Sequence, residues 1–265
     1  MTQTDSTSLL QSFAIQRRVV FALLMREILT RYGRHNIGFM WIFVEPMMFT
    51  LGVTTVWSLG HMTHGSNLPI AAFAVTGYSS LLVWRNSANR CAKAIEPNMA
   101  LLYHRNVRIL DVFLARLILE IAGATASITA LILFFMAIGM ISAPADILTM
   151  TLGWILQCWY GASIGLIVGA LSERSEAVDR IWHTVTYLMF PFSGAVFLVD
   201  WLPHSVQGLV LLLPMVHGAE MIRHGYFGTA IITHENPTYF IVANLILLFI
   251  GLSLVREASR RVEPE

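Results

Sequence analysis

Long apolar stretches alternate with shorter polar segments along the whole chain. Six stretches carry almost no charge, and most of them hold about 20 residues, which is enough for a helix to cross a hydrocarbon core of about 30 Å. The stretches are residues 38–60, 69–84, 112–140, 150–171, 181–199 and 239–255. This pattern predicts an all-α polytopic membrane protein with six transmembrane helices.

The composition supports a membrane location. Of the 265 residues, 56% are hydrophobic and 12% are charged, whereas about a quarter of the residues in a soluble domain are charged. Residues 1–35 contain five arginines and no apolar stretch that ends in a cleavage site, so we expect the N-terminus to be retained. We expect one transmembrane domain over residues 36–256, between this cytoplasmic N-terminus and a cytoplasmic tail at 257–265.

The basic residues predict the orientation of the chain, because cytoplasmic loops retain Lys and Arg. With six spans and both termini in the cytoplasm, sixteen of the 17 Lys and Arg residues fall on the cytoplasmic side. Arg223 alone falls on the outer side. This strong asymmetry favours six spans over seven.

The segment before the last span is apolar but interrupted. Residues 205–213 are too few to cross a bilayer before Pro214, and a seventh span here would place the basic C-terminal residues outside. We therefore expect residues 205–227 to form a re-entrant or surface-lying helical hairpin on the outer face, within an outer segment over 200–238.

Two polar segments on the cytoplasmic side have helical character. Before the first span, an apolar face opposes Arg18 and Arg26, which is typical of an amphipathic helix in the membrane interface, although Val19 and Leu23 interrupt the polar face. The apolar face consists of Phe13, Val20, Leu24 and Ile28. Residues 85–111, the longest polar stretch, form either a solvated loop or a docking helix for a cytoplasmic partner.

The chain lacks the motif that P-loop ATPases need. Their GxxxxGK[ST] sequence uses a lysine to reach the terminal phosphates. Lys93 is the only lysine here, and alanines flank it on both sides. The chain therefore cannot hydrolyse ATP by this mechanism.

The sequence "GASIG" at residues 161–165 matches the GxSxG pattern of serine hydrolases. No histidine in the last predicted span pairs with Ser163, so a hydrolase is disfavoured. Together with Gly169, the two glycines recur every four residues, a spacing that lets helices pack closely. Close packing is the favoured interpretation.

The cysteines and histidines do not predict a cross-link or a metal centre. Cys91 falls in a cytoplasmic loop and Cys158 inside a span, so a disulfide between them is excluded by geometry. His61 and His64 have the spacing of metal ligands, but a third ligand is not evident. We expect no metal.

Glu45 and Pro46 lie inside the first predicted span. Glu45 falls about 10 Å from the cytoplasmic end, and a charged residue at that depth faces the bundle interior or a water-filled cavity. It either lines a substrate path, together with Trp41, or is the proton site of a carrier, or pairs with a nearby arginine. Pro46 predicts a helix kink near Ile42, and Pro191 predicts another in the fifth span.

Trp159 and Tyr160 lie near the middle of the fourth predicted span, away from the interfaces where aromatic residues usually gather. They either pack in the core or offer a stacking face to sugar rings that pass through the protein. Both interpretations are open from the sequence, and the second makes them candidate residues of the substrate path.

Five segments of the sequence resemble those of a known protein family. In order, they are "LLMREILTRYGRHNIGFMWIFVEP", "NRCAKAIEPNMALLYHRNV", "DVFLARLILE", "FPFSGAVFLVDWLP" and "PMVHGAEMIRHGYF". Together they resemble the membrane subunit of Gram-negative capsular polysaccharide exporters, which are permeases of the ABC-2 type. The likeness covers residues 23–256, and it departs at Leu213, where many relatives carry Asn before the proline.

The resemblance implies a permease of the bacterial inner membrane that works as a homodimer, with the polysaccharide path at the dimer interface. It also implies two copies of a separate cytoplasmic P-loop ATPase, which bind ATP and magnesium, so that the chain itself is not an enzyme and holds no cofactor. A lipid-linked capsular polysaccharide would pass to a periplasmic adaptor and an outer-membrane channel. No nucleic acid is expected as a partner.

The resemblance also assigns residues. The loop at 85–111 would include the coupling helix, whose ATPase-coupling residues would be Arg90, Glu96 and Asn98. Glu45 would lie in the cytoplasmic half of the path.

Three arginines near the cytoplasmic membrane surface are candidates for binding the anionic lipid head of the substrate. They are Arg31, Arg34 and Arg85. Anionic bilayer lipids would attract them equally.

Two other functions stay open at this point. One is an ABC-2 exporter of another substrate, such as O-antigen, teichoic acid or a drug. The other is a proton-coupled carrier that uses Glu45.

For Glu45, we expect Glu45→Ala to leave the protein in the membrane but to lower the amount of polysaccharide on the cell surface, because the path loses its polar lining. Quantitative immunoblotting and surface-polysaccharide staining measure the two quantities. Normal export would contradict the lining role, and loss of the protein would instead favour a buried ion pair.

Overall fold

The computed structural model describes residues 9–32, 36–59, 68–102 and 107–262, which are mainly helical. The α-helices are α1 (Leu9–Tyr32), α2 (Asn36–Leu59), α3 (Ile70–Cys91), α4 (Met99–Leu102), α5 (Ile109–Ala137), α6 (Ile147–Ser172), α7 (Glu176–Met189), α8 (His204–Val210), α9 (Pro214–Phe227) and α10 (Pro237–Val262). The 3-10 turns are η1 (Glu96–Asn98), η2 (Phe190–Phe192), η3 (Val199–Trp201) and η4 (Gly228–Ala230).

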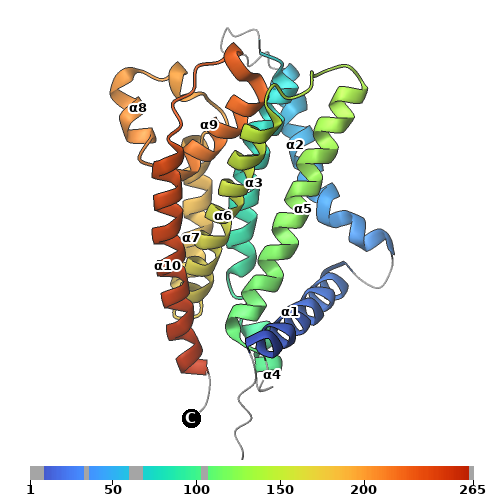
Figure 1. Ribbon diagram of the computed structural model, residues 1–265, viewed down its shortest axis with the longest axis vertical. Coiled ribbons are helices and arrows are strands. Elements are labelled where there is room, and N and C mark those ends of the chain that lie inside the picture. Colours follow the sequence, from blue (N-terminus) through green and yellow to red (C-terminus); the bar gives the residue numbers. More distant parts are fainter. Residues whose placement is uncertain (1–8, 33–35, 60–67, 103–106, 263–265) are drawn as a thin grey trace, which may run out of the picture.

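Six helices run lengthwise as a bundle. Figure 1 shows α2, α3, α5, α6, α7 and α10 along the long axis, with α1 across the lower end and α8 at the upper end. In the described part of the chain, α5, α6 and α10 are each long and apolar enough to cross a membrane, and the α8–α9 pair is a fourth candidate. The all-α membrane fold is therefore confirmed at this level.

The fifth predicted span is wrong in its extent. Residues 181–199 were expected to cross, whereas α7 begins at Glu176 and stops at Met189, and Pro191 lies in the η2 turn that follows. Pro191 therefore marks the end of the helix instead of a kink within it, because its ring disfavours a further helical turn. Gly194 then adopts a φ of 76°, which favours glycine and redirects the chain.

The predicted outer hairpin corresponds to α8 and α9, which are bent by 107° at a short break. Both lie toward the upper end of the bundle (Figure 1). Most residues of α9 are buried, Glu220 and Arg223 among them. The two-helix element is present, while its re-entry into a membrane stays a prediction.

The centre of the bundle is the contact of α6 with α3 and α5. A Cβ atom on Gly161 would lie 2.9 Å from the Cα of Trp84, and one on Gly169 would lie 3.0 Å from the carbonyl oxygen of Cys91. Such distances leave room only for hydrogen, so the glycines bring the two backbones together, as small residues do between membrane helices. The predicted packing role of the glycines is confirmed, and Ser163 is buried and bonds to the carbonyl of Trp159.

The apolar face predicted to lie in the membrane interface stays a prediction, and the face of α1 that packs on the bundle is largely a different one, although Leu24 also contacts the lower core. Phe13 is 70% exposed, whereas Leu23 is buried and packs with its neighbour Val19 against the lower core. Gln16 and Glu27 share this inward face and bond to α5. Because polar residues lie on the buried face, hydrophobicity alone does not identify it.

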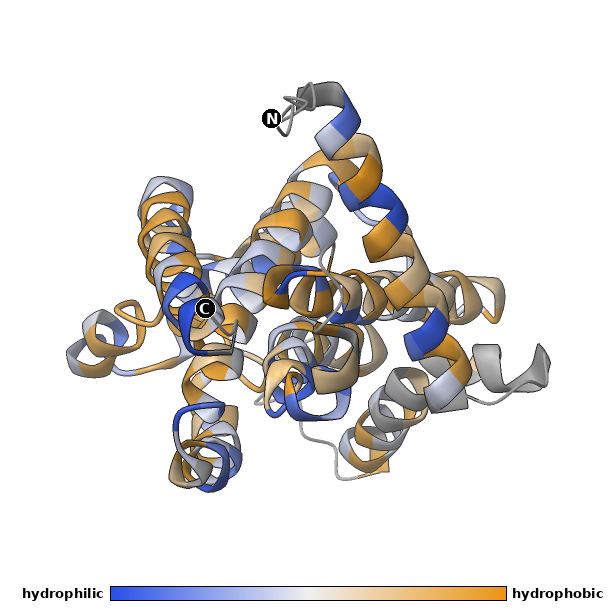
Figure 2. Ribbon diagram, turned by 90° about the horizontal axis from the view of Figure 1, so that it is seen from below, coloured by the Kyte–Doolittle hydropathy of each residue, from blue (hydrophilic) through white to orange (hydrophobic). Residues whose placement is uncertain are grey.

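Charged residues gather at the lower end. Figure 2, seen from below, shows hydrophilic positions on α1 and on the near ends of the other helices, while the lengths of the helices are mostly hydrophobic. The C-terminal end of α10 lies at the same end as α1 (Figure 1). This separation of charged end and apolar body agrees with a chain that crosses a membrane.

For the glycine contact, we expect Gly161→Ala to lower the melting temperature in detergent, because the added methyl group meets the Trp84 backbone and overpacking costs about 1–3 kcal/mol. Gly52→Ala is the matched control, because a Cβ at Gly52 meets nothing within 4 Å. Equal melting temperatures for the two variants would show that α6 and α3 can move apart at little cost.

Candidate functional site

The polar segment between α3 and α5 is folded against the lower end of the bundle. Its backbone donates twice to the turn between α6 and α7: the Ile95 N–H to the Glu173 carboxylate at 3.0 Å, and the Lys93 N–H to the Ser172 hydroxyl at 3.1 Å. Burial raises the pKa of the Glu173 carboxyl above its ordinary value, although the Ile95 N–H opposes this. Ala94 and Ile95 are buried, so the segment is anchored and not a solvated loop.

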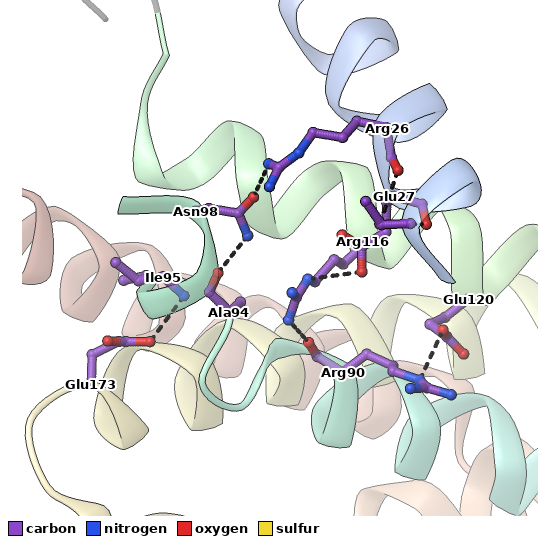
Figure 3. A network of polar contacts seen from close by, with 10 residues as sticks. Arg26, Glu27, Arg90, Ala94, Ile95, Asn98, Arg116, Glu120 and Glu173 are labelled. Carbon is purple, nitrogen blue, oxygen red and sulfur yellow. Dashed lines mark hydrogen bonds and ion pairs between the residues drawn. The ribbon is translucent and has the colours of Figure 1, made fainter. Parts of the chain in front are cut away.

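The same segment contacts α1 on its other side. The Arg26 guanidinium donates to the Asn98 side-chain oxygen, and the Asn98 amide donates to the Ala94 carbonyl at 2.8 Å. Asn98 therefore bonds both to α1 and to the turn in which it lies. Asn98 is 4% exposed. Figure 3 shows these contacts beside the one between Ile95 and Glu173. The segment lies between α1 and the α6–α7 turn.

Ion pairs join the surrounding helices to one another. Arg116 of α5 pairs with Glu27 of α1 at 3.3 Å and donates to the carbonyl of Arg90 at 2.7 Å. Arg90, near the end of α3, pairs with Glu120 of α5 at 3.3 Å (Figure 3). The charges of α1, α3 and α5 are thus matched across the helices.

The structure separates the three residues predicted to couple to an ATPase. Arg90 joins α3 to α5, and Asn98 points inward. Glu96 is exposed, and so are Pro97, Met99 and Ala100, which give the segment an outward surface. The docking role of the loop stays a prediction: Glu96 and the 41% exposed side chain of Arg90 are on the surface, whereas Asn98 is buried.

The two aromatic residues of α6 differ in position. Tyr160 is 7% exposed and packs between Trp84 and Phe240, with ring centroids 6.1 and 6.2 Å away. Its ring therefore packs in the core, which is one of the two alternatives that the sequence left open, and a role in the substrate path stays a prediction. Trp159 is partly buried, so its role is still a prediction.

Several predicted residues fall outside what the structure describes. Arg34 lies outside the described ranges, and the side chains of Arg31, Trp41, Glu45 and Pro46 are likewise not described. Glu45 on the path and the kink at Pro46 stay predictions. Figure 1 does show that α2 bends along its length.

Arg85 is described. Its guanidinium lies 5.7 Å from the ring centre of Tyr187 on α7, so it joins α3 to α7 through a cation–π contact. Binding of a lipid headgroup by Arg85 stays a prediction.

The upper end is organised by Arg223, which is fully buried on α9. Its guanidinium donates to the backbone carbonyls of Gly194, Ala195 and Phe197 and lies 3.8 Å from the ring centre of Phe73 on α3. The residue thus fastens the segment after η2 to both α9 and α3. Its role in the fold was not predicted, although its position as the single outer arginine was a signal.

Glu220, one helical turn from Arg223, performs the same task for two other segments. Its carboxylate accepts from the Val199 N–H at 3.3 Å and from the His234 N–H at 3.1 Å. The connection before α10 and the η3 turn are therefore both held by α9. Among the described residues, no group of three or more His, Cys, Asp or Glu side chains could hold a metal ion.

The outward faces of the helices differ in chemistry. Along α10 the exposed side chains are mostly aliphatic, as expected against lipid: Ile241, Val242, Leu245, Ile246, Ile250 and Leu252. On α7 the exposed side chains are mixed and include His183, Thr184 and Tyr187. An open apolar depression of about 460 Å³ lies along α2 between Met48 and Trp57.

An apolar helical bundle with several candidate spans, an anchored polar segment at one end and a buried polar network at the other defines a polytopic helical membrane protein. The chain belongs to the ABC-2 type transporter family, whose model matches residues 18–227. The family resemblance read from the sequence is thereby confirmed.

Relatives match the chain over nearly its full length. It is 48% identical to the capsule polysaccharide export inner-membrane protein CtrC of Neisseria meningitidis serogroup B, over 100% of both chains. It is 43% identical to the capsule polysaccharide export inner-membrane protein BexB of Haemophilus influenzae, over 98% of each chain. It is 26% identical to the polysialic acid transport protein KpsM of Escherichia coli, over 92% of this chain and 95% of that one.

For the upper end, we expect Arg223→Met to destabilise the protein by about 3–5 kcal/mol, because it removes one charge of a buried polar network and leaves three carbonyls without their donor. The melting temperature in detergent and the protease resistance of the 194–203 segment measure the effect. Arg256→Met, at an exposed position of α10, is the control and should change little. Similar melting temperatures would contradict the structural role of Arg223.

Proposed function

We propose that the chain is the transmembrane permease subunit of an ATP-driven exporter that moves lipid-linked capsular polysaccharide across the bacterial inner membrane. The observation that carries the proposal is full-length similarity, at 48% and 43% identity, to two capsule polysaccharide export inner-membrane proteins. The more distant relative named for polysialic acid transport agrees with a polysaccharide as the substrate.

We infer six membrane spans, supported by the helices that run lengthwise and by the charge pattern. The spans are α2, α3, α5, α6, α7 with the η2 turn, and α10, all of which run lengthwise (Figure 1). The lower end faces the cytoplasm, because the basic residues gather there and cytoplasmic loops retain them. Both termini are then cytoplasmic, and α8 and α9 form a re-entrant hairpin on the periplasmic side.

A separate ATPase supplies the energy. The only lysine of the chain, Lys93, is paired with Asp179 at 3.2 Å and is not part of a P-loop. Two copies of a cytoplasmic P-loop ATPase dock on the surface that contains Glu96, Pro97 and Met99, which is the exposed side of an otherwise anchored segment. ATP and magnesium are bound by that partner.

The transport path lies between two copies of the chain. The aliphatic outward face of α10 suits lipid, whereas the mixed face of α7 and the depression along α2 offer the contacts that a second copy and a sugar chain need. Glu45 and Trp159 line this path, and Arg85 stands near its cytoplasmic entry. A periplasmic adaptor and an outer-membrane channel receive the polysaccharide.

The first test is purification of the tagged chain from its native membrane in mild detergent. We expect a P-loop ATPase to co-purify in equal amount, because the chain has no nucleotide site of the P-loop kind. Quantitative mass spectrometry of the purified complex gives the ratio of the subunits. Size measurement by light scattering tests for two copies of each.

The genetic control is deletion of the gene for this chain, which should remove surface polysaccharide and leave the unexported polysaccharide inside the cell. Expression of the chain from a plasmid should restore the surface polysaccharide. If no nucleotide-binding protein co-purifies in several detergents and transport instead follows the proton gradient, the exporter proposal is wrong and a proton-coupled carrier replaces it.

A further inference from the structure

Two side chains at the α6–α7 turn bind the backbone of the polar segment and not the side chains of that segment. The two acceptors, Ser172 and Glu173, bind two donors of one tight turn, the N–H groups of Lys93 and Ile95, while the Ala94 N–H between them bonds to the Cys91 carbonyl. Lys93 has a φ of 50°, so the turn has a defined left-handed shape at this point. Because both acceptors bind backbone groups, their bonds depend on the position of the segment and not on what its side chains contact.

A third contact continues from the turn into α7. The Lys93 ammonium pairs with Asp179 at 3.2 Å, and Asp179 lies in the first turn and a half of α7, where it also approaches His183 at 3.7 Å. The polar segment is therefore joined to the end of α6, to the residue after it and to the start of α7.

The remaining contacts of α7 with its neighbours are few and lie on one side. Besides α6, it meets α3 through the Trp182 indole, which donates to Asn89 at 2.9 Å, and through the cation–π contact of Tyr187. Most of its other side chains are exposed. A helix held along one side and joined to the segment at its lower end can be tilted from that end.

The opposite side of the segment is more firmly fixed. Asn98 accepts from Arg26 of α1, and α1 is itself paired with α5 through Glu27 and Arg116 (Figure 3). Since α1 and α5 are joined by charges and by the packing of Leu23 in the lower core, a displacement of the segment meets more resistance there than at α7.

We propose that Ser172 and Glu173 are positioning residues that transmit displacement of the polar segment to α7, and thereby couple the partner ATPase to the transport path. This inference rests on the proposed function. It places the transmitting contact in the α6–α7 turn, outside the 85–111 loop itself. When the ATPase shifts the segment, the bonds to Ser172 and Glu173 draw the turn with it and change the tilt of α7.

The test compares variants of Glu173 in the complex of the chain with its co-purified ATPase, in lipid nanodiscs and in cells. Glu173→Ala removes the acceptor for Ile95, and the ratio of surface polysaccharide to ATP hydrolysed should fall about tenfold, within the usual range of coupling between two sites. Glu173→Gln keeps a carbonyl oxygen at the same place and should retain most of the ratio.

Ser175→Ala is the matched control in the same turn. The Ser175 hydroxyl accepts only from the Ala177 N–H within α7 and does not reach the polar segment. A loss of coupling through general weakening of the turn would appear in Ser175→Ala as well. We expect this variant to keep the normal ratio.

A thiol reporter on α7 separates transmission from a merely structural role. Ile181→Cys places a thiol near the lower end of α7, at a residue that is 61% exposed, while the native Cys91 and Cys158 are buried. Its maleimide labelling rate should change when ATP and vanadate trap the ATPase, and this change should be lost with Glu173→Ala but kept with Glu173→Gln and Ser175→Ala.

Three results would overturn the inference. They are a normal ratio of export to hydrolysis in Glu173→Ala, an unchanged response of the reporter in that variant, and loss of the ATPase from the purified complex, which would make Glu173 part of the docking surface. If Glu173→Ala does not fold, Ser172→Ala takes its place under the same criteria, because it removes the bond to Lys93 and, besides that, the bond that the Ser172 hydroxyl donates to the Gly169 carbonyl within α6. Absence of an ATPase from the unmodified complex would instead refute the proposed function itself.

Discussion

The close approach of α6 to α3 is the constraint on which the rest of the structure depends. Gly161 and Gly169 let the two backbones meet, and α3 is consequently enclosed by α2, α5, α6 and α9. A helix enclosed on so many sides cannot shift freely in register. The lower end of α3 therefore sets the point at which the polar segment begins, and the upper part of α3 places Phe73 against the Arg223 guanidinium.

Charged side chains bind different kinds of partner at the two ends of the bundle. At the lower end, carboxylates and guanidinium groups from separate helices are paired, as with Glu27 and Arg116, so each helix is fastened to its neighbours by side chains. At the upper end, Arg223 and Glu220 instead bind backbone groups of irregular segments. Charged side chains there replace the secondary structure that would otherwise satisfy those carbonyl and N–H groups. The lower end thus joins helices by ion pairs and also holds the polar segment through Ser172 and Glu173, whereas the two buried charged residues of the upper end hold irregular segments.

Several features of the fold could be predicted because they depend on local patterns. The glycine spacing in α6, the break before Pro214 and the apolar stretches of α5 and α10 are all visible in the sequence, and each has a single dominant physical meaning. The direction in which each side chain points was harder to predict from the sequence. For Tyr160 the sequence left core packing and sugar stacking both open, and for α1 it did not identify Leu23 as the residue that packs on the bundle, because helical periodicity gives relative angles and not the direction of the neighbouring helix.

By itself, the sequence determined that this is an apolar helical chain with one charged end, without a P-loop, and similar to ABC-2 permeases, because composition and motifs need no knowledge of distant contacts. Only the tertiary structure decided that the polar segment is anchored, and that its contact is with the α6–α7 turn about 80 residues away in the chain. Backbone donors such as the Ile95 N–H exist at nearly every residue. The packing of the helices therefore decides which acceptor each donor binds, and the amino-acid sequence does not predict it.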